Sequence, residues 1–423
     1  MCNLVMSLEI RSKKAKYMEL AFICALMILL LISAFKAFPA GPGLIGLSTT
    51  NLEIGDRPFY INDSNPFGEK GYASFKGSFL YPKVLEIISF LSINVFGQST
   101  TSFAWSGIAV FFTSIIAIVI NRIIYASGRL VGGENTGIIA MGLFAISPYT
   151  YFYALSGGIT MYTLFGVSLS TYLFLSLANN KTTFGDSWVE VCILFAALVA
   201  TSSLRPSAII FCATVSLSSA CYSLLGLIRS RKNKPQLSII LMLSVLSLSI
   251  YAHQFIQTSS YSLAAFEAFV REPGTFFGYE RFKLSHNINT LFSADSLFDK
   301  AQACIYLLCW KILDFTSGII DLRDTHSAES FPSLFSFIAR IFSGMFYLAP
   351  LSLFSTTSIL MFWRFFNSKG LSVCIVGAAL AVSPSLLGVA MSRYYIMFLS
   401  PFLLAASYLI SKFPNLTDVR AES

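Results

Sequence analysis

The sequence predicts an all-α protein that crosses a membrane about ten times, because apolar runs of membrane length recur along the chain and each crossing needs roughly 20 such residues. Of the 423 residues, 55% are apolar and only 12% are charged, whereas about 25% of the residues of a typical soluble domain are charged. The mean hydropathy is +0.69. These values exclude a soluble globular enzyme.

Charge-poor runs give the expected spans in chain order. Three of the runs are too long for one helix. They are divided at 148–158, at Arg205-Pro206 and at Arg393, because Pro and Gly interrupt helices and a charge prefers the membrane interface. The runs are 20–38, 103–120, 136–178, 190–228, 237–255, 341–363 and 371–410.

Basic residues orient these spans. When both termini are placed in the cytoplasm, short loops at 122–135, 179–187, 229–236 and 364–370 become cytoplasmic as well. Together with the termini, these loops hold more than half of the 29 Lys and Arg residues, as expected for short cytoplasmic loops. The net charge of +8 therefore marks topology rather than nucleic-acid binding. We expect a multi-pass protein of the plasma (inner) membrane whose first helix is retained.

The single membrane domain, 1–423, is predicted to have two long outer loops, at 39–102 and 254–340. In the first loop, the apolar-periodic stretch at 80–96 bears Lys83 and Glu86. This pattern suits a helix that lies on the membrane surface.

The second outer loop contains a similar stretch at 301–320, which Lys311 and Asp314 interrupt. We expect a surface helix there too. The alternative is that 301–320 crosses the membrane, which would invert the topology of all later segments and place Arg364 and Lys369 outside. The positive-inside rule disfavours that alternative.

Two groups of side chains have alternative interpretations. Asp321, Asp324 and His326 are suitable metal ligands by type, but their spacing matches no defined metal motif, so a solvated and internally paired loop is favoured. The aromatic residues after Pro148 could stack on sugars, but an interfacial belt is favoured, since multi-span proteins carry such belts. These aromatic residues are Tyr149, Tyr151, Phe152 and Tyr153.

Several short elements, taken in order, resemble the lipid-carrier-dependent GT-C glycosyltransferases, of the protein mannosyltransferase and aminoarabinose transferase type. A basic turn closes the second span, and the other elements are sequence motifs. These are Asp-x-x-x-Tyr at 56–60, Leu80-Tyr81-Pro82 at the head of the surface helix, Ala145-Ile146-Ser147-Pro148 before the aromatic stretch, and Arg393-Tyr394-Tyr395 before the last helix.

The resemblance implies an enzyme that transfers a sugar from a polyprenyl-phosphate donor to an acceptor glycan, lipid or protein at the outer face. An Asp of the first outer loop is then the general base or the acceptor-orienting group, which here is Asp56. Many members carry a second acid directly beside the first, where this chain has Arg57. Asp63 and Glu69 are candidate substitutes. A divalent cation is a candidate cofactor, and its ligands stay open.

The departing phosphate requires positive charge, for which Arg205, Arg323 and Arg393 are the candidates. The alternative interpretations are a snorkelling side chain for Arg205 and an interface anchor for Arg393. The candidates for packing against the lipid carrier or the sugar are Tyr60, Tyr394 and Tyr395.

Two other functions stay open. A lipid-linked polysaccharide polymerase or ligase would also act outside the membrane, but on a pyrophosphate-linked oligosaccharide. A transporter or flippase would require ionisable groups within the spans and related halves, and the sequence shows neither.

Overall fold

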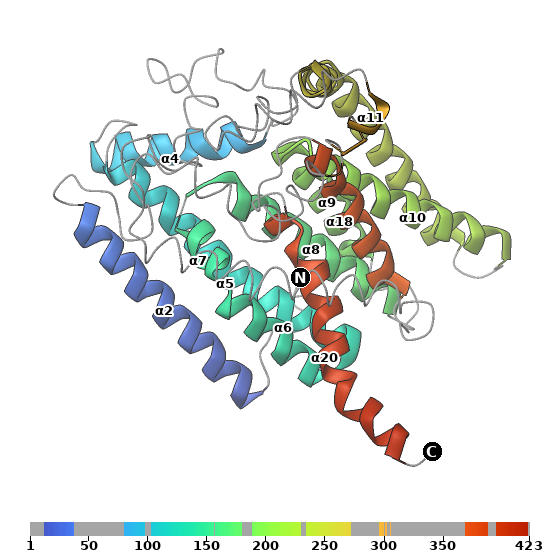
Figure 1. Cartoon of the computed structure of the whole chain (residues 1–423), viewed down its shortest axis with the longest axis horizontal. Coiled ribbons are helices and arrows are strands. Elements are labelled where there is room, and N and C mark those ends of the chain that lie inside the picture. Colours follow the sequence, from blue (N-terminus) through green and yellow to red (C-terminus); the bar gives the residue numbers. More distant parts are fainter. Residues whose placement is uncertain are drawn as a thin grey trace.

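The computed structural model describes residues 12–37, 80–97, 103–155, 157–179, 188–229, 234–271, 296–299, 301–302, 305, 369–387 and 395–421. Within these ranges the chain forms helices and turns and contains no strand (Figure 1). The all-α class is therefore confirmed for this part of the chain.

The helices follow one another closely. In chain order they are α2 (Lys13–Ala37), α4 (Leu80–Phe96), α5 (Phe103–Gly132), α6 (Glu134–Ile146), α7 (Pro148–Ala154), α8 (Ile159–Asn179), α9 (Trp188–Leu204), α10 (Ala208–Arg229), α11 (Lys234–Arg271), α18 (Lys369–Leu387) and α20 (Leu399–Ala421). Among the described helices, 4 are long and apolar enough to cross a membrane, namely α5, α8, α10 and α11, and α6, α9, α18 and α20 contain shorter apolar helices. The chain is thus a multi-pass membrane protein.

The helix breaks lie where Pro and Gly predict them. Helix α7 begins with Pro148. Pro is tolerated at the first position of a helix, because an N–H group there would have no partner within the helix. Gly157 has φ +68°, a left-handed conformation that glycine adopts without steric cost, and it leads into α8. The turn at Arg205 separates α9 from α10. The expected breaks at 148–158 and at Arg205-Pro206 are confirmed.

One expected loop is wrong. The segment 122–132 belongs to α5, and only Gly133 separates α5 from α6. The charges of this segment indicated a loop, but Arg122 pairs with Glu19 of α2, and Arg129 lies 3.2 Å from Glu134 of α6. Because neighbouring helices pair these charges, the helix continues past the point where the apolar run ends.

Consecutive helices that cross the bundle run in alternating directions. A Cβ atom on Gly157, before α8, would touch Ala109 near the start of α5, whereas one on Gly132, at the end of α5, would touch Tyr408 of α20. We call the end with the α5–α6 turn the basic end, and the opposite end, with the α9–α10 turn, the Arg205 end. In Figure 1, α4 lies across the top of the bundle, and its buried side chains pack at the Arg205 end.

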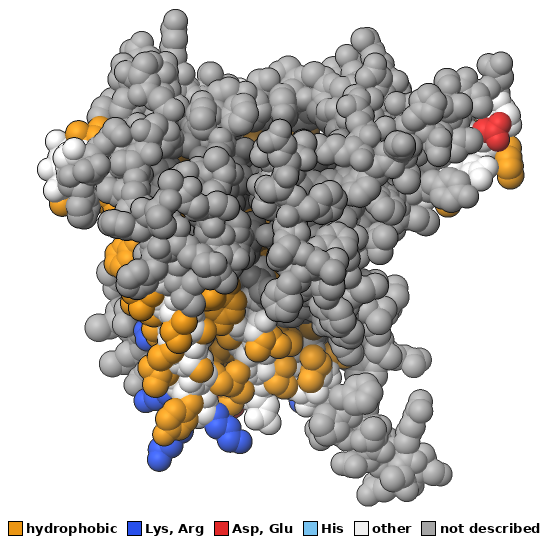
Figure 2. Space-filling model, turned by 60° about the vertical axis from the view of Figure 1, so that its left-hand side comes forward, with side chains coloured by type: hydrophobic (Ala, Val, Ile, Leu, Met, Phe, Trp, Pro, Cys, Tyr) orange, Lys and Arg blue, Asp and Glu red, His pale blue; other side chains and the backbone are white. Residues whose placement is uncertain are grey.

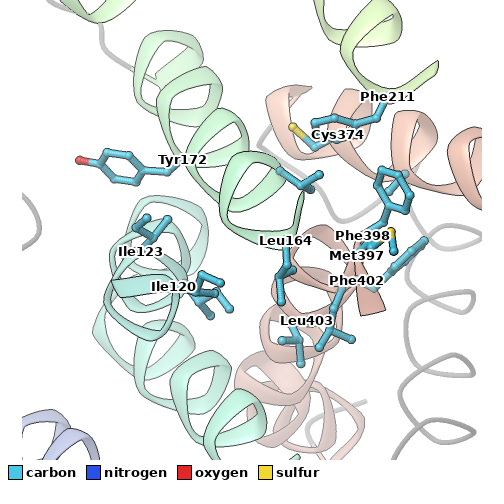
Figure 3. Close-up of a cluster of buried hydrophobic side chains, with 14 of the residues drawn as sticks. Ile120, Ile123, Leu164, Tyr172, Phe211, Cys374, Met397, Phe398, Phe402 and Leu403 are labelled. Carbon is cyan, nitrogen blue, oxygen red and sulfur yellow. The ribbon is translucent and has the colours of Figure 1, made fainter. Parts of the chain in front are cut away.

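The core lies between α5, α8, α10, α18 and α20. The rings of Phe211 and Phe398 lie 6.1 Å apart and link α10 to the segment just before α20. Figure 3 shows them beside Cys374 and Met397, with Leu164 on the facing side. Small residues bring the backbones close elsewhere, as expected for helices that pack in lipid.

The aromatic residues of α7 belong to this core. Tyr149 and Tyr153 are buried in it, and the ring of Tyr151 lies 5.5 Å from that of Phe22 in α2. The expectation of an interfacial belt is therefore wrong for Tyr149 and Tyr153. Helix α7 packs against α5, where the Thr113 hydroxyl donates to the Ala154 carbonyl at 2.6 Å.

Candidate functional site

The structure describes two of the residues that the sequence singles out for function, Arg205 and Tyr395. The aspartates and histidine considered as metal ligands, Asp321, Asp324 and His326, lie outside the described residues. So do the other site candidates, which are Asp56, Tyr60, Asp63, Glu69, Arg323, Arg393 and Tyr394.

Arg205 occupies the turn that joins α9 to α10. Pro206 cannot continue α9, so the chain turns there and α10 starts two residues later, at Ala208. The N–H of Ala208 donates to the Arg205 carbonyl at 3.0 Å, and the N–H of Ile209 donates to the Pro206 carbonyl at 3.1 Å. The side chain of Arg205 is half-buried. The turn therefore holds a guanidinium group at one end of the bundle.

Helix α4 covers the same end. Its residues Tyr81, Leu85 and Ile88 are buried in one cluster with Ala109 of α5 and Leu204, the neighbour of Arg205. The opposite face of α4 exposes large apolar side chains, Ile87, Phe90 and Val95 among them. The helix predicted at 80–96 is thus confirmed, and it is amphipathic. Its position on a membrane surface stays a prediction.

Gln254 of α11 joins the Arg205 turn from a distant part of the chain. Its Nε2 atom donates to the Ser203 hydroxyl oxygen at 3.0 Å, and Ser203 in turn donates to the Val199 carbonyl at 2.8 Å. The side chain of Gln254 is only 4% exposed. The sequence analysis missed this residue, because a single Gln near the end of an apolar run gives no signal until α9 packs against α11.

Two buried hydroxyl groups lie at the same end. Tyr162 of α8 packs against the cluster that contains Leu204, and its ring lies 6.0 Å from that of Tyr81. Ser207 lies within the turn itself. Within the described part of the chain, neither hydroxyl oxygen has a hydrogen-bond partner.

We call Tyr162, Ser203, Arg205, Ser207 and Gln254 the Arg205 cluster. It combines a cation with hydroxyl and amide groups in a largely buried setting. A guanidinium group binds phosphate through charge-assisted hydrogen bonds, and hydroxyl and amide groups are the few polar contacts that orient a ligand in a mostly apolar site. The cluster has the chemistry to bind a phosphorylated sugar.

Tyr395 lies in the core rather than in this cluster. It is buried, and its ring stacks on Phe402 at 5.1 Å with an interplanar angle of 12°. Its contact with a lipid carrier stays a prediction. No group of three or more His, Cys, Asp or Glu residues in the described ranges could hold a metal ion.

No protein-family model matches the sequence, and a search of curated proteins gives no match. Among solved structures, the chain is similar to the archaeal oligosaccharyltransferase AglB from Archaeoglobus fulgidus, in complex with an inhibitory peptide and a dolichol-phosphate. The TM-score is 0.50 and the identity 15%, over 97% of this chain and 52% of that chain.

Two further structures of the Archaeoglobus fulgidus oligosaccharyltransferase are similar to a lesser degree. The form tethered to an acceptor peptide with the NVT sequon has a TM-score of 0.49 and 15% identity, over 96% of this chain and 51% of that chain. The complex with Zn and sulfate has a TM-score of 0.47 and 14% identity, over 92% and 49%.

This chain spans about half the length of the archaeal enzyme. At 15% identity, the likeness concerns the fold. The chain therefore shares the fold of the part of the archaeal oligosaccharyltransferase that it covers.

Proposed function

We propose that this protein is a glycosyltransferase that moves a sugar from a polyprenyl-phosphate donor to an acceptor at the extracytoplasmic face of the plasma membrane, in the synthesis of a cell-surface glycan or glycoconjugate. The observation that carries the proposal is the Arg205 cluster, which lies beneath α4 at one end of a GT-C fold. The similar archaeal structure holds a dolichol-phosphate, a lipid carrier of the class proposed here.

The proposed topology places the basic end in the cytoplasm and the Arg205 end outside, with about ten spans of roughly 20 residues. Lys13, Lys14 and Lys16 are exposed at the start of α2. Figure 2 shows Lys and Arg side chains gathered at the lower end of an apolar surface. The positive-inside rule places such residues in the cytoplasm, which supports cytoplasmic termini and an outer Arg205 cluster.

The described helices also bear on the number of spans. Helix α11 reaches the Arg205 end, where Gln254 contacts Ser203, whereas α18 starts at the basic end, where Gly370 lies against Ala178 of α8. A single span between them, which the sequence predicts at 341–363, would connect these two ends. A second span at 301–320 would return the chain to the Arg205 end before α18. The arrangement supports 301–320 as part of the outer loop.

In the proposed reaction, Asp56 accepts the proton of the acceptor hydroxyl group as its oxygen attacks the anomeric carbon. The bond between that carbon and the phosphate oxygen breaks, and the polyprenyl phosphate leaves with the electron pair. Arg205 stabilises the developing negative charge by charge-assisted hydrogen bonds. Arg323 and Arg393 are further candidates for this role.

The remaining candidates have supporting roles. Asp63 or Glu69 replaces the second acid that Arg57 displaces, and a divalent cation, if used, takes carboxylates of this loop as ligands. Tyr60, Tyr394 and Tyr395 pack against the carrier or the sugar. Chelation by EDTA tests the cation: lost transfer that Mn²⁺ or Mg²⁺ restores supports it, and unchanged transfer removes it.

The catalytic assignment is tested by Asp56→Asn in the full chain, reconstituted in liposomes with a polyprenyl-phosphate sugar. We expect transfer to fall by about 10²- to 10⁴-fold, the usual contribution of a general base, while the variant still folds. The matched control is Glu86→Gln, which changes an α4 carboxylate that pairs with Lys83 at 2.9 Å. Full activity of Asp56→Asn would remove Asp56 from the mechanism.

The donor class is tested by mass spectrometry of the lipids that co-purify with the protein in native-membrane particles. A polyprenyl monophosphate sugar that is retained by wild type and weakly by Arg393→Ala supports the proposal. A pyrophosphate-linked oligosaccharide would instead identify a polymerase or ligase. Equal retention by Arg393→Ala would make Arg393 an interface anchor.

A further inference from the structure

We propose that Gln254 recognises the donor's sugar by accepting a hydrogen bond from a sugar hydroxyl or N–H group next to the phosphate. This inference rests on the proposed function and adds to it a specificity-determining residue that the sequence analysis did not identify. It follows from the orientation of the Gln254 amide, the burial of its oxygen, and its contact with Ser203, two residues before Arg205.

The orientation of the Gln254 amide follows from a chain of hydrogen bonds. Ser203 has one hydroxyl hydrogen, and it donates that hydrogen to the Val199 carbonyl at 2.8 Å. The Ser203 oxygen can therefore only accept from Gln254, so the group 3.0 Å away must be the NH₂ end of the amide. The amide oxygen Oε1 is then the end that points away from Ser203.

The end of this amide that points away from Ser203 can only be an acceptor, because a carbonyl oxygen carries no hydrogen. Gln254 is 4% exposed, and Oε1 is buried with no hydrogen-bond partner in the part of the chain that the structure describes. A buried polar atom without a partner is destabilising. A ligand that completes this site must supply a donor group.

A phosphate cannot be that ligand group. The phosphodiester of a polyprenyl-phosphate sugar is ionised and has acceptor oxygens only. Its oxygen and Oε1 would face each other as two acceptors with no hydrogen between them. Sugar hydroxyl groups and acetamido N–H groups are donors. The hydroxyl groups of Tyr162 and Ser207, also buried without a described partner, can either donate or accept, so they suit sugar hydroxyl groups as well.

The position of Gln254 matches the layout of a glycosyl phosphate. Ser203, which holds the Gln254 amide, is two residues before Arg205, so Gln254 contacts the same end of α9 that Arg205 follows. In the donor, the substituent on C2 of the sugar is adjacent to the anomeric carbon that bears the phosphate. When Arg205 binds the phosphate, Gln254 can therefore accept a hydrogen bond from the neighbouring sugar substituent.

The test compares lipid probes by native mass spectrometry of the full chain in lipid nanodiscs. The probes are undecaprenyl phosphate without a sugar, and undecaprenyl-phosphoryl glucose, mannose, galactose and N-acetylglucosamine. The variants are Gln254→Met, which has nearly the same volume but no amide, and Ser203→Ala, which removes only the group that orients the amide. Gln257→Met is the matched control, because Gln257 lies one turn further on α11 and is exposed.

We expect Gln254→Met to weaken the sugar-bearing probe that wild type binds best by about tenfold, the effect of one lost hydrogen bond that leaves a ligand group unpaired. Binding of undecaprenyl phosphate should not change. Ser203→Ala should weaken the same probe less, by about threefold, since the acceptor remains but loses its orientation. Gln257→Met should match wild type with every probe.

The outcomes separate the two proposals. If wild type binds no sugar-bearing probe better than undecaprenyl phosphate, the proposed donor is wrong and Gln254 loses its ligand. If wild type prefers a sugar-bearing probe but Gln254→Met and Ser203→Ala keep that preference, only the role of Gln254 is wrong. Equal weakening of all probes by Gln254→Met would show that Gln254 supports the fold and does not read the sugar.

Discussion

Arg205 lies in the turn between α9 and α10 and places a cation at that end of the bundle. A charged side chain near the membrane is costly to keep and is commonly found where a protein binds an ion or a charged substrate. Here the buried amide of Gln254 contacts Ser203, two residues before Arg205. The surroundings favour a ligand contact over simple snorkelling, because α4 covers this end.

At this scale we predict that Arg205→Gln weakens binding of undecaprenyl phosphate by about 10- to 100-fold, since a hydrogen bond to a charged group contributes about 1.5–3 kcal/mol. Native mass spectrometry in nanodiscs measures the change. Lys83→Gln is the control, because Lys83 is a basic residue of α4 at the same end, and its side chain is 66% exposed. Equal affinity of Arg205→Gln and wild type would contradict a phosphate contact.

At the scale of elements, α4 is the helix that closes the Arg205 end. The two faces of α4 differ in exposure, as two neighbouring residues show. Ile88 is 1% exposed and packs in the cluster with Leu204, whereas Ile87 is 58% exposed. The buried face ties α4 to α5, α8 and α9. The exposed face suits the apolar side of a membrane interface.

We predict that Ile88→Ala loosens α4, because removing a buried Ile side chain costs about 2–5 kcal/mol in packing. Hydrogen exchange of the amides of α4 should then speed up by at least about tenfold relative to wild type. Ile87→Ala provides the neighbouring control and should leave exchange nearly unchanged. Similar exchange rates in the two variants would mean that α4 is not held by this cluster.

The α5–α6 pair shows the close backbone approach typical of helices in lipid. A Cβ atom added to Gly128 would lie 2.7 Å from the Cα atom of Gly137, too close for two backbones to coexist without a shift. Gly137 is equally confined, since its own Cβ would lie 2.8 Å from the Tyr125 carbonyl oxygen. Glycine is thus required on both sides of this contact.

Gly128→Ala should therefore destabilise the protein by about 1–3 kcal/mol, the usual cost of overpacking. The matched control is Gly107→Ala on the same helix, where nothing lies within 4 Å of the added Cβ. That control should be neutral or gain up to about 1 kcal/mol from helix propensity. Unfolding in mixed micelles measures both, and equal stability of the two variants would refute the tight contact.

At the scale of the whole molecule, the alternating helices separate two chemically different ends. The basic end carries Lys13, Lys14 and Lys16 on exposed positions of α2, and the ion pair between Arg122 and Glu19 ties α2 to α5 there. The other end carries α4 and the Arg205 cluster. The proposed function requires that these ends face opposite sides of the membrane.

We predict that cysteines introduced at Asn94 and Asn135 react with a membrane-impermeant maleimide from opposite sides. Both positions are exposed, Asn94 on α4 and Asn135 at the α5–α6 turn. In a background without other reactive cysteines, Asn94→Cys should be labelled in intact cells, and Asn135→Cys only after permeabilisation. The reverse pattern would place the Arg205 cluster in the cytoplasm and contradict the proposed extracytoplasmic site of transfer.

Local features of the sequence predict much of this fold. Pro148, Gly157 and Pro206 act on their own backbone, so the breaks around α7 and between α9 and α10 are found in the sequence itself. The amphipathic pattern of 80–96 predicts α4, and the charge of Arg205 at such a break identifies it as a site candidate. The roles of Asp56, Arg323 and Arg393 are also predictions from sequence, and they lie outside the described residues.

The tertiary structure decides what depends on partners far away in the chain. Arg122 was expected in a loop, but its pairing with Glu19 of α2 lets α5 continue through it. Tyr149 and Tyr153 were expected at the membrane interface, but the fold buries them in the core.

The sequence by itself determined that this is a membrane protein of many helices, where several of those helices break, and that Arg205 is a candidate for function. Hydrophobicity and backbone restriction act over a few neighbouring residues, so these properties can be read from short segments. Only the tertiary structure decided that Gln254 meets Ser203, a residue 51 positions away. That contact depends on the rotation and register of α11 against α9, which the packing of the whole bundle sets.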